Sequence, residues 1–412
     1  MKESSLIKNV DLFLDDKPSV YALRDRAKKC LFDYGFPTKK NENWKYTDVK
    51  EILIRDFDIN QKQCDGECCC KNKAEDSYFI EFCFCAGTLH VEDFVLPEGV
   101  NVIPLPLMLY EGEYKKYLFN AFDLKKHPFA CLNGMYLEQG LCIIVDKGIK
   151  VDVPLLIKYK NTKSDNIQMN IHNVVVLEKN ANLSIVEEFY SKVDNSYLLN
   201  IVNEIYLKEN SELNHYKIQK ESKKAYHIAL NALKIYEKAK YKQYYVSNGA
   251  KISRNENEIN LEAKDALAEI YSAYKVSKDM LSDITTNVNH NVLETSSNQY
   301  AKAVLEDGAK AVFQGKVYIA KDAVKSVGNQ LHKALYLDGD AELCCKPQLE
   351  IYADDVKCSH GASCGEIDEE QLFYLTSRGI AKDVAVKLIT DAHLNEIYSL
   401  IEDEVIREKF II

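Results

Sequence analysis

The feature that most restricts the fold is a loose internal repeat in the middle and later parts of the chain. In each copy, an aliphatic residue is followed by a few polar or turn residues, then Ala or Ser, then a run in which apolar and polar residues alternate. Alternation with a period of two predicts strands that bury one face. Stacked coils of such strands pair their backbone groups and build a continuous core. The copies begin at Leu177, Leu207, Ile235, Leu261, Leu305, Ile319 and Leu337.

These repeats predict a mainly β protein with a solenoid of parallel strands over residues 78–365. The first four copies are spaced 30, 28 and 26 residues apart, and the later ones are spaced less evenly. Irregular spacing is compatible with a solenoid, because each coil contacts only its neighbours. The pattern alone also allows an antiparallel sandwich with long hairpins.

An amino-terminal region, residues 1–77, carries helical signals. Leu23, Ala27 and Leu31 recur on one face of a 3.6-residue period, and Gly35 is placed to end that helix. We therefore expect a helical region ahead of the solenoid. The only tryptophan, Trp44, lies in this region and is expected to be a packing anchor.

A polar stretch within this region, residues 59–76, is expected to be a linker and is rich in cysteine. Its spacing, C-x3-C-C-C, differs from the C-x2-C pair that is typical of zinc sites. A metal site and a redox-sensitive surface loop both remain open for it. The four cysteines are Cys64, Cys68, Cys69 and Cys70.

The carboxyl-terminal region, residues 366–412, is expected to be helical. Asp368 is a candidate N-cap with Gln371 three residues later, as in a capping box, and Gly379 marks the end of that helix. Such a domain would either cap the last coil or bind a partner. Two further helices are expected on the apolar sets Val384, Leu388, Ile389 and Leu394, Ile397, Leu400, Ile401.

Composition narrows the class of protein. Asp and Glu outnumber Lys and Arg by 63 to 53, and binding to nucleic acid relies on the basic residues to neutralise phosphates. No stretch approaches the ~20 apolar residues that cross a bilayer, and the amino terminus has no secretory signal pattern. We expect a cytoplasmic protein with neither a nucleic-acid nor a membrane partner. The 13 cysteines are then expected to be free thiols, available for metal, cluster or sulfur chemistry or simply buried.

Catalytic motifs are nearly absent. The segment 308–317 superficially resembles a phosphate-binding loop, but six residues separate its glycines where four are needed. It also has Val317 where Ser or Thr would hold Mg²⁺. We therefore do not expect an enzyme.

The densest set of candidate metal ligands lies near the end of the predicted solenoid, at residues 354–364. In an extended strand Cys358 and His360 project to the same side, so a thiolate and an imidazole form half of a site for iron or a cluster. Gly361 is expected to end the regular strand, which leaves the direction of Cys364 undecided. A buried cysteine beside a solvated histidine is the alternative.

Three segments together resemble the SufD family, a component of the SUF system of iron–sulfur cluster assembly. The run KPQLEIYADDVKCSHGASCGEIDEEQLFYLTSRGI, residues 346–380, resembles the carboxyl-terminal signature of that family. The segment ENWKYT, residues 42–47, resembles its amino-terminal motif, and residues 288–317 resemble a third stretch. The related SufB subunit differs where this chain has KCSHGA. The matching residues of the third stretch include His290, Ser297, Asn298, Gln299 and Val312 to Lys316.

The resemblance implies a right-handed parallel β-helix between an amino-terminal helical region and a carboxyl-terminal helical domain. It also implies a non-catalytic scaffold that works with SufB and the ATPase SufC. That complex assembles a cluster from iron and persulfide sulfur and passes it to apo-proteins. SufB would pair through the carboxyl-terminal strands of the β-helix, and SufC would bind residues 366–412.

The same resemblance implies a transient iron–sulfur cluster shared with SufB, and ATP bound only through SufC. His360 is the first candidate ligand at the SufB interface and Cys358 the second. Cys364 and the cysteines of residues 64–70 match no family motif and receive no role. Whether the isolated chain forms a homodimer is left open.

The sequence leaves two other functions open. One is a carbohydrate-active β-helix enzyme, against which the absence of an export signal and the richness in thiols both argue. The other is a self-sufficient homodimeric metal-binding protein that uses the cysteines of residues 64–70.

Overall fold

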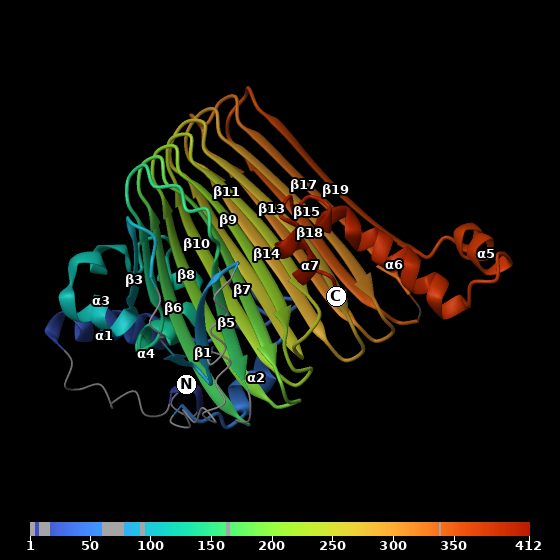
Figure 1. The fold of residues 1–412 in the computed structure, drawn as a ribbon, viewed down its shortest axis with the longest axis horizontal. Helices are drawn as coiled ribbons and strands as arrows, with labels where there is room; N and C mark the ends of the chain where they lie inside the picture. The colour runs from blue at the N-terminus through green and yellow to red at the C-terminus, as the bar shows by residue number, and fades with distance from the viewer. Residues whose placement is uncertain (1–4, 8–16, 60–77, 91–94, 162–164, 338) are drawn as a thin grey trace.

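The computed structural model describes residues 5–7, 17–59, 78–90, 95–161, 165–337 and 339–412. Figure 1 shows a β-solenoid in which successive coils stack side by side, with helices near both ends of the chain. The prediction of a mainly β fold with a solenoid core and terminal helices is confirmed. Antiparallel pairing is confined, in these described ranges, to β1 with β2 and β3 with β4, so the sandwich alternative is wrong.

Each coil contributes one strand to each of two sheets, so alternate strands of the chain are neighbours. The ten-stranded sheet contains, in spatial order, β2 (Thr88–His90), β1 (Ile80–Cys85), β5 (Leu155–Asn161), β7 (Asn182–Ser191), β9 (Glu212–Lys220), β11 (Lys240–Ser247), β13 (Leu267–Val276), β15 (Ser296–Leu305), β17 (Val327–Tyr336) and β19 (Lys357–Glu366). The nine-stranded sheet contains β3 (Val100–Pro104), β4 (Leu141–Val145), β6 (Ile167–Leu177), β8 (Tyr197–Leu207), β10 (Tyr226–Ile235), β12 (Ile252–Leu261), β14 (Leu281–His290), β16 (Lys310–Ile319) and β18 (Glu342–Ile351).

The turns between coils explain the polar residues at the start of each repeat. Asn180, Asn210 and Asp265 adopt left-handed backbone conformations, with φ of 62°, 58° and 61°. Asn and Asp tolerate this region better than other non-glycine residues, because their short side chains hydrogen-bond locally. The polar residues of the repeat therefore turn the chain from one sheet to the other.

A ladder of amide side chains runs through the interior of the solenoid, on the inner face of the nine-stranded sheet. Asn173 donates to Asn203 over 2.9 Å, Asn203 to Asn231 over 3.0 Å, and Asn231 to Asn257 over 2.9 Å. Asn257 then donates to the hydroxyl of Thr286 over 3.1 Å. Each residue thus has a partner in the next coil, and the ladder stabilises one register of stacking.

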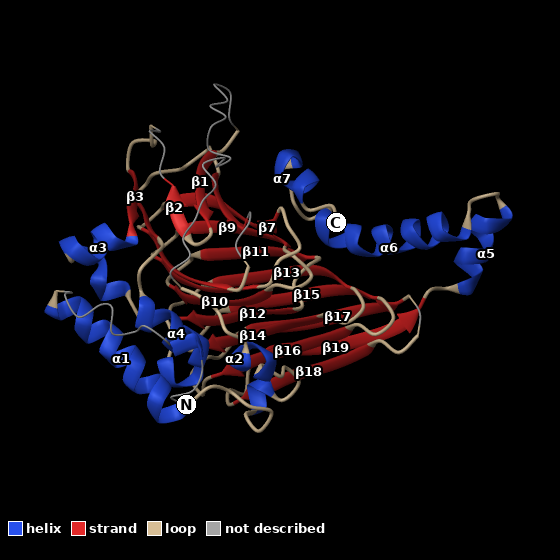
Figure 2. Cartoon of the chain, turned by 90° about the horizontal axis from the view of Figure 1, so that it is seen from below, coloured by secondary structure: helices blue, strands red, loops and turns tan. Residues whose placement is uncertain are grey.

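The helices of the amino-terminal half pack on the outer face of the nine-stranded sheet (Figure 2). Two of them, α3 and α4, lie between β3 and β4 and so fall inside the range 78–365 expected for the solenoid. The helices of this half are α1 (Pro18–Tyr34), α2 (Lys50–Ile54), α3 (Leu105–Glu111) and α4 (Pro128–Tyr136), with 3-10 turns η1 (Ser5–Ile7), η3 (Glu42–Trp44), η5 (Glu113–Tyr117) and η6 (Leu124–Lys126).

Trp44 anchors this region to the solenoid, as expected for the only tryptophan. Its ring is buried, and the guanidinium of Arg254 on β12 lies 4.0 Å from the ring centroid. Arg254 also forms a buried ion pair with Asp283 on β14, and Asp283 accepts a hydrogen bond from the hydroxyl of Thr47. A buried charge is stable only when it is paired and hydrogen-bonded, and here the amino-terminal segment supplies part of that pairing.

The carboxyl-terminal helices are α5 (Glu369–Ser377), α6 (Lys382–Tyr398) and α7 (Glu404–Lys409). The prediction that Asp368 is the N-cap of the first helix, α5, is confirmed, because its side chain accepts hydrogen bonds from the backbone N–H groups of Glu370 and Gln371. The two helices expected after it are wrong as separate elements: the first apolar set and Leu394 and Ile397 of the second lie on the single helix α6. That helix ends at Tyr398, so Leu400 and Ile401 lie beyond it.

The later part of α6 lies on the outer face of the ten-stranded sheet, while α5 projects away from both sheets (Figures 1 and 2). Glu396 of α6 accepts a hydrogen bond from the hydroxyl of Tyr300 over 2.8 Å and pairs with the ammonium of Lys302. No helix within the described ranges has the length and apolar character needed to cross a lipid bilayer.

Candidate metal-ligand site at the open end of the solenoid

The last coil leaves one edge of each sheet open. β18 pairs only with β16 and β19 only with β17 among the described strands. Both strands are ten residues long and are exposed or half-buried along their whole length. An uncovered strand edge presents a row of backbone donors and acceptors and is a template for pairing with another strand.

The two candidate ligands both lie on β19. In the parallel register, Cys358 lies beside Gly328 and His360 beside Gln330. Gly328 and Gln330 belong to the inner face of β17, where buried residues alternate with half-buried ones. Cys358 and His360 therefore share the inner face, about 7 Å apart along the strand, as the two-residue spacing predicts. Cys358 is half-buried and His360 is exposed.

The expectation that Gly361 ends the strand is wrong. β19 continues to Glu366, and Gly361 pairs with Leu331 in an unbroken register. A Cβ on Gly361 would lie 3.2 Å from a methyl carbon of Leu331, so the glycine makes room for this neighbour while the strand stays regular. Cys364 consequently points to the same face as His360, a direction that the sequence left undecided.

The surroundings of Cys358 shift the pKa of its thiol upward. Burial raises its pKa, and the backbone at Gly328 opposes this only in part. A lowered thiol pKa would be a supporting sign of a metal ligand, and the isolated chain does not show one. A metal ion at this position would have to displace the thiol proton.

Two glutamine side chains lie in a column beneath His360. Gln330 is its neighbour on β17, and Gln299 follows on β15. Both are buried, and their Oε1 atoms come within 2.9 and 3.0 Å of where a Cβ on Gly315 would stand. Neither Oε1 accepts a hydrogen bond from any described residue, and Nε2 of Gln299 donates none to them. The motif residues Gln299 and Gly315 thus meet inside the solenoid, which no spacing rule predicts.

The amino-terminal motif reaches this end of the molecule. The carboxylate of Glu42 pairs with the ammonium of Lys346 on β18 over 2.6 Å, and the pKa of Glu42 is lowered by this contact. The backbone carbonyl of Asn43 accepts a hydrogen bond over 3.2 Å from Gln314 on β16. The two resembling segments, 42–47 and 346–380, are therefore in direct contact.

The described residues do not form a complete metal site. No group of three or more His, Cys, Asp and Glu side chains among them is arranged to hold an ion. His360 and Cys358 could contribute two ligands, and the remaining ligands would have to come from elsewhere. The candidates Cys64, Cys68, Cys69 and Cys70 lie outside the described residues.

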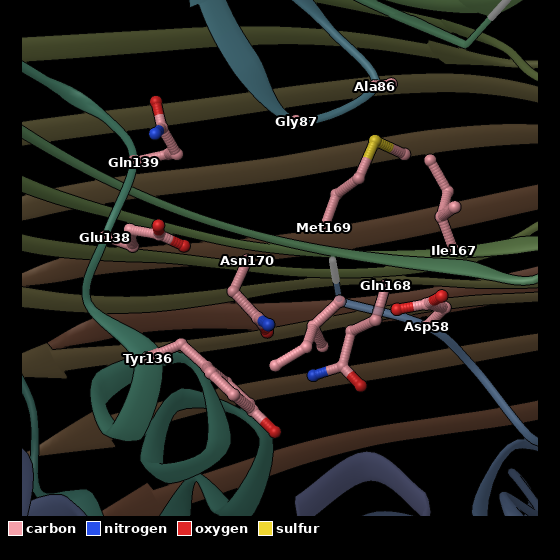
Figure 3. A pocket seen from close by; sticks show the side chains of 11 residues that line it. Asp58, Ala86, Gly87, Tyr136, Glu138, Gln139, Ile167, Gln168, Met169 and Asn170 are labelled. Atoms are coloured by element: carbon pink, nitrogen blue, oxygen red, sulfur yellow. The ribbon is translucent and has the colours of Figure 1, made fainter. Parts of the chain in front are cut away.

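A pocket at the opposite end of the solenoid is of a different kind. It lies between β6 and the turn at Ala86 and Gly87, and its space of about 400 Å³ includes a part that is open to solvent (Figure 3). Met169, Asn170 and Gln139 contribute to its wall, which contains neither histidine nor cysteine. It therefore lacks the imidazole and thiol ligands that the open end presents.

Comparison with known proteins shows similarity over nearly the whole chain. A protein of Escherichia coli named iron–sulfur cluster assembly protein SufD is 28% identical over 397 residues, which are 92% of this chain and 89% of the relative. An iron–sulfur cluster assembly SufBD family protein of Synechocystis sp. is 27% identical, over 91% of this chain and 86% of the relative. The chloroplastic protein ABCI7 of Arabidopsis thaliana is 26% identical, over 94% of this chain and 84% of the relative.

Two family models match consecutive parts of the chain. The model of the SufBD protein N-terminal region matches residues 8–157, which include the amino-terminal helices and the first strands. The model of the SufBD core domain of SUF-system iron–sulfur cluster assembly matches residues 159–393, which include the open end with Cys358 and His360. The core match alone spans more than half of the chain, and the chain therefore belongs to the SufBD family of iron–sulfur cluster assembly proteins.

Proposed function

We propose that this chain is a SufD-type scaffold subunit, a non-catalytic cytoplasmic protein that assembles and transfers clusters together with a SufB-like subunit and a SufC-like ATPase. Its similarity to the SufD protein of Escherichia coli over nine-tenths of both chains supports the SufD type. The observation that carries the proposal is the open last coil, which presents His360 on the inner face of a ten-residue edge strand.

The SufB-like partner pairs with β18 and β19. Both edges are long, regular and without a strand partner in the described chain, and they end the two sheets at the same coil. A second solenoid placed against them continues both sheets and hydrogen-bonds backbone groups that are otherwise left to water. This pairing buries His360, which is exposed in the isolated chain.

Iron and sulfide are the cargo of this interface. His360 and Cys358 contribute an imidazole and a thiolate, ligand types that iron–sulfur clusters accept from proteins. The partner contributes the remaining ligands, because the described chain brings no third ligand to these two. The cluster is therefore shared and transient: on release, its bonds to His360, Cys358 and the partner's ligands break, and ligands of the recipient protein take their places.

The SufC-like ATPase binds the projecting helices α5 and α6. α5 has no buried residue, and Phe373 and Tyr374 on it are 73% and 56% exposed. On α6, Leu388 is 48% exposed. An apolar surface of this kind on an arm held away from the sheets is typical of a protein interface. ATP enters the complex only through this partner.

The test is anaerobic co-purification of the tagged chain with SufB-like and SufC-like proteins, followed by iron and sulfide analysis. Wild type is expected to recover both partners and a cluster. His360→Ala is expected to recover both partners with most of the cluster lost. Ser359→Ala is the matched control, since Ser359 is the neighbour of His360 on the opposite face of β19, where it bonds Asn329.

Three results would contradict the proposal. They are failure of wild type to recover either partner, normal cluster content with His360→Ala, and equal loss in the Ser359→Ala control. Cleavage of a polysaccharide by the purified chain would favour the carbohydrate-active enzyme instead.

A further inference from the structure

Two more cysteines lie on the inner faces of the last coil at the open end, one on each sheet. Cys345 on β18 lies beside Phe313 of β16, and Cys364 on β19 lies beside Ala334 of β17. Phe313 and Ala334 belong to one buried cluster in the interior, and Cys345 packs against that same cluster. Both cysteines therefore lie next to this buried cluster, Cys345 on the inner face of β18 and Cys364 on the inner face of β19.

The electrostatics of Cys345 agree with this placement. Burial is the main cause that raises its pKa to about 11, and the charge of Cys364 is the second. The negative charge of one thiolate raises the pKa of another thiol only when the two groups are close together. The hydroxyl of Tyr336, on the inner face of β17, also interacts with Cys364.

This pair is separate from the site at His360. Cys364 follows His360 by four residues, which is about 13 Å along an extended strand, too far for both to bind one ion. Cys344 adjoins Cys345 on β18 but has the opposite parity and lies on the outer face, beside Val312. The inner pair is thus distinct in position from each neighbouring thiol and imidazole.

We propose that Cys345 and Cys364 form a second half-site, which binds a thiophilic divalent metal ion, with ferrous iron as the cargo. Two thiolates, one from each sheet, occupy two positions of a tetrahedral ion, and the open edge leaves the other two to water or to a partner. Each thiol releases its proton when the ion binds. The inference rests on the proposed function only for the identity of the cargo, since the thiol pair itself belongs to the isolated chain.

The experiment follows alkylation of individual cysteines by mass spectrometry in the isolated full chain, under anaerobic conditions. Labelling is measured without metal, with Zn²⁺ alone and with Fe²⁺ alone. Both ions are expected to slow the alkylation of Cys345 and Cys364 together, by about tenfold or more, because a bound thiolate is not free to react. Protection of Cys364 is expected to disappear in Cys345→Ser, and protection of Cys345 in Cys364→Ser.

Two controls separate this pair from its surroundings. Cys344→Ser is expected to retain protection of both thiols, because that side chain lies on the outer face. His360→Ala is also expected to retain it, so loss of the His360 site and loss of this pair are distinguishable. If Cys345→Ser does not fold, Cys364→Ser tests the same coupling from an exposed position.

The proposal is overturned if neither ion changes the labelling of Cys345 and Cys364. It is equally overturned if one thiol stays protected when the other is replaced, or if Cys344→Ser abolishes protection as completely as Cys345→Ser does.

Discussion

Gln330 lies directly beneath His360 in the stacked coils, and its buried Oε1 accepts no hydrogen bond from any described residue. Its Nε2 donates to the backbone carbonyl of Gln348 over a long distance of 3.4 Å. A buried acceptor without a partner destabilises the folded state. Packing alone therefore gives no reason for a glutamine at this position next to the candidate ligand.

Replacing this glutamine by a side chain of similar shape is expected to be harmless to the fold. Gln330→Met removes the unpartnered oxygen and keeps the volume, so the free energy of unfolding should rise or fall by less than about 1 kcal/mol. Urea denaturation of the isolated chain measures this. A loss of several kcal/mol would show that Oε1 has a partner in solution, such as an ordered water.

Replacing an amide of the ladder by an apolar side chain is expected to destabilise the fold, unlike Gln330→Met. Asn231 accepts from Asn203 and from the buried ammonium of Lys217, and donates to Asn257. Asn231→Leu leaves these groups without this partner, and we expect a loss of about 2–4 kcal/mol in the free energy of unfolding. Urea denaturation in parallel with Gln330→Met makes the comparison direct. Equal effects of the two variants would contradict the assignment of the ladder as stabilising.

Stability should fall as the pH falls below neutrality, in part because of His290. Burial lowers the pKa of His290 to about 4, and both ring nitrogens bond to hydroxyl groups, at 2.8 Å to Thr295 and 2.9 Å to Ser297. The unfolded chain takes up the proton near pH 6.5, whereas the folded chain does so only near pH 4. The contribution of neutral His290 to the free energy of unfolding is therefore fully present above about pH 6.5. It is lost as the pH falls from about 6.5 to about 4, by up to about 3 kcal/mol.

The measurement is urea denaturation at several pH values from mildly alkaline to mildly acidic, in wild type and in His290→Asn. The variant is expected to show a shallower loss of stability over this interval, because its side chain does not titrate. If the free energy of unfolding falls equally steeply with pH in both proteins, His290 is not a cause of the loss of stability.

The projecting helix α5 should be dispensable for the fold and required for the ATPase. Phe373→Ala removes an apolar side chain that is 73% exposed, so we expect a change of less than about 0.5 kcal/mol in the free energy of unfolding. Capture of a SufC-like protein should fall severalfold, while capture of a SufB-like protein is unchanged. Val405→Ala on α7 is the control, an exposed apolar side chain outside the arm. Loss of both partners with Phe373→Ala would argue against separate interfaces.

Much of this architecture could be predicted from local pattern. Alternating apolar residues identify strands, the polar residues at Asn180 and Asp265 mark the turns, and Asp368 marks the start of a helix. These signals act over a few residues, so a single sequence is enough to detect them. The shared face of Cys358 and His360 follows from strand periodicity in the same way.

Contacts between distant segments could not be predicted in this way. The meeting of Gln299 with Gly315, and the placement of Cys345 and Cys364 beside one buried cluster, depend on the stacking register, which is set by the sum of many coils. The continuation of β19 through Gly361 depends on pairing with β17, a strand of another coil, along its whole length. Local propensity favours an end to the strand there, and the tertiary contact overrides it.

The segment 42–47 also has a consequence for how long this solenoid can be. It contacts β12 through Trp44, β14 through Thr47, β16 through Asn43 and β18 through Glu42. Because neighbouring strands are about 4.8 Å apart, these four contacts measure a fixed length of about 14 Å along the stack. The segment therefore fixes the number of coils between β12 and β18, because a variant with one coil added or removed there could not form all four contacts at once.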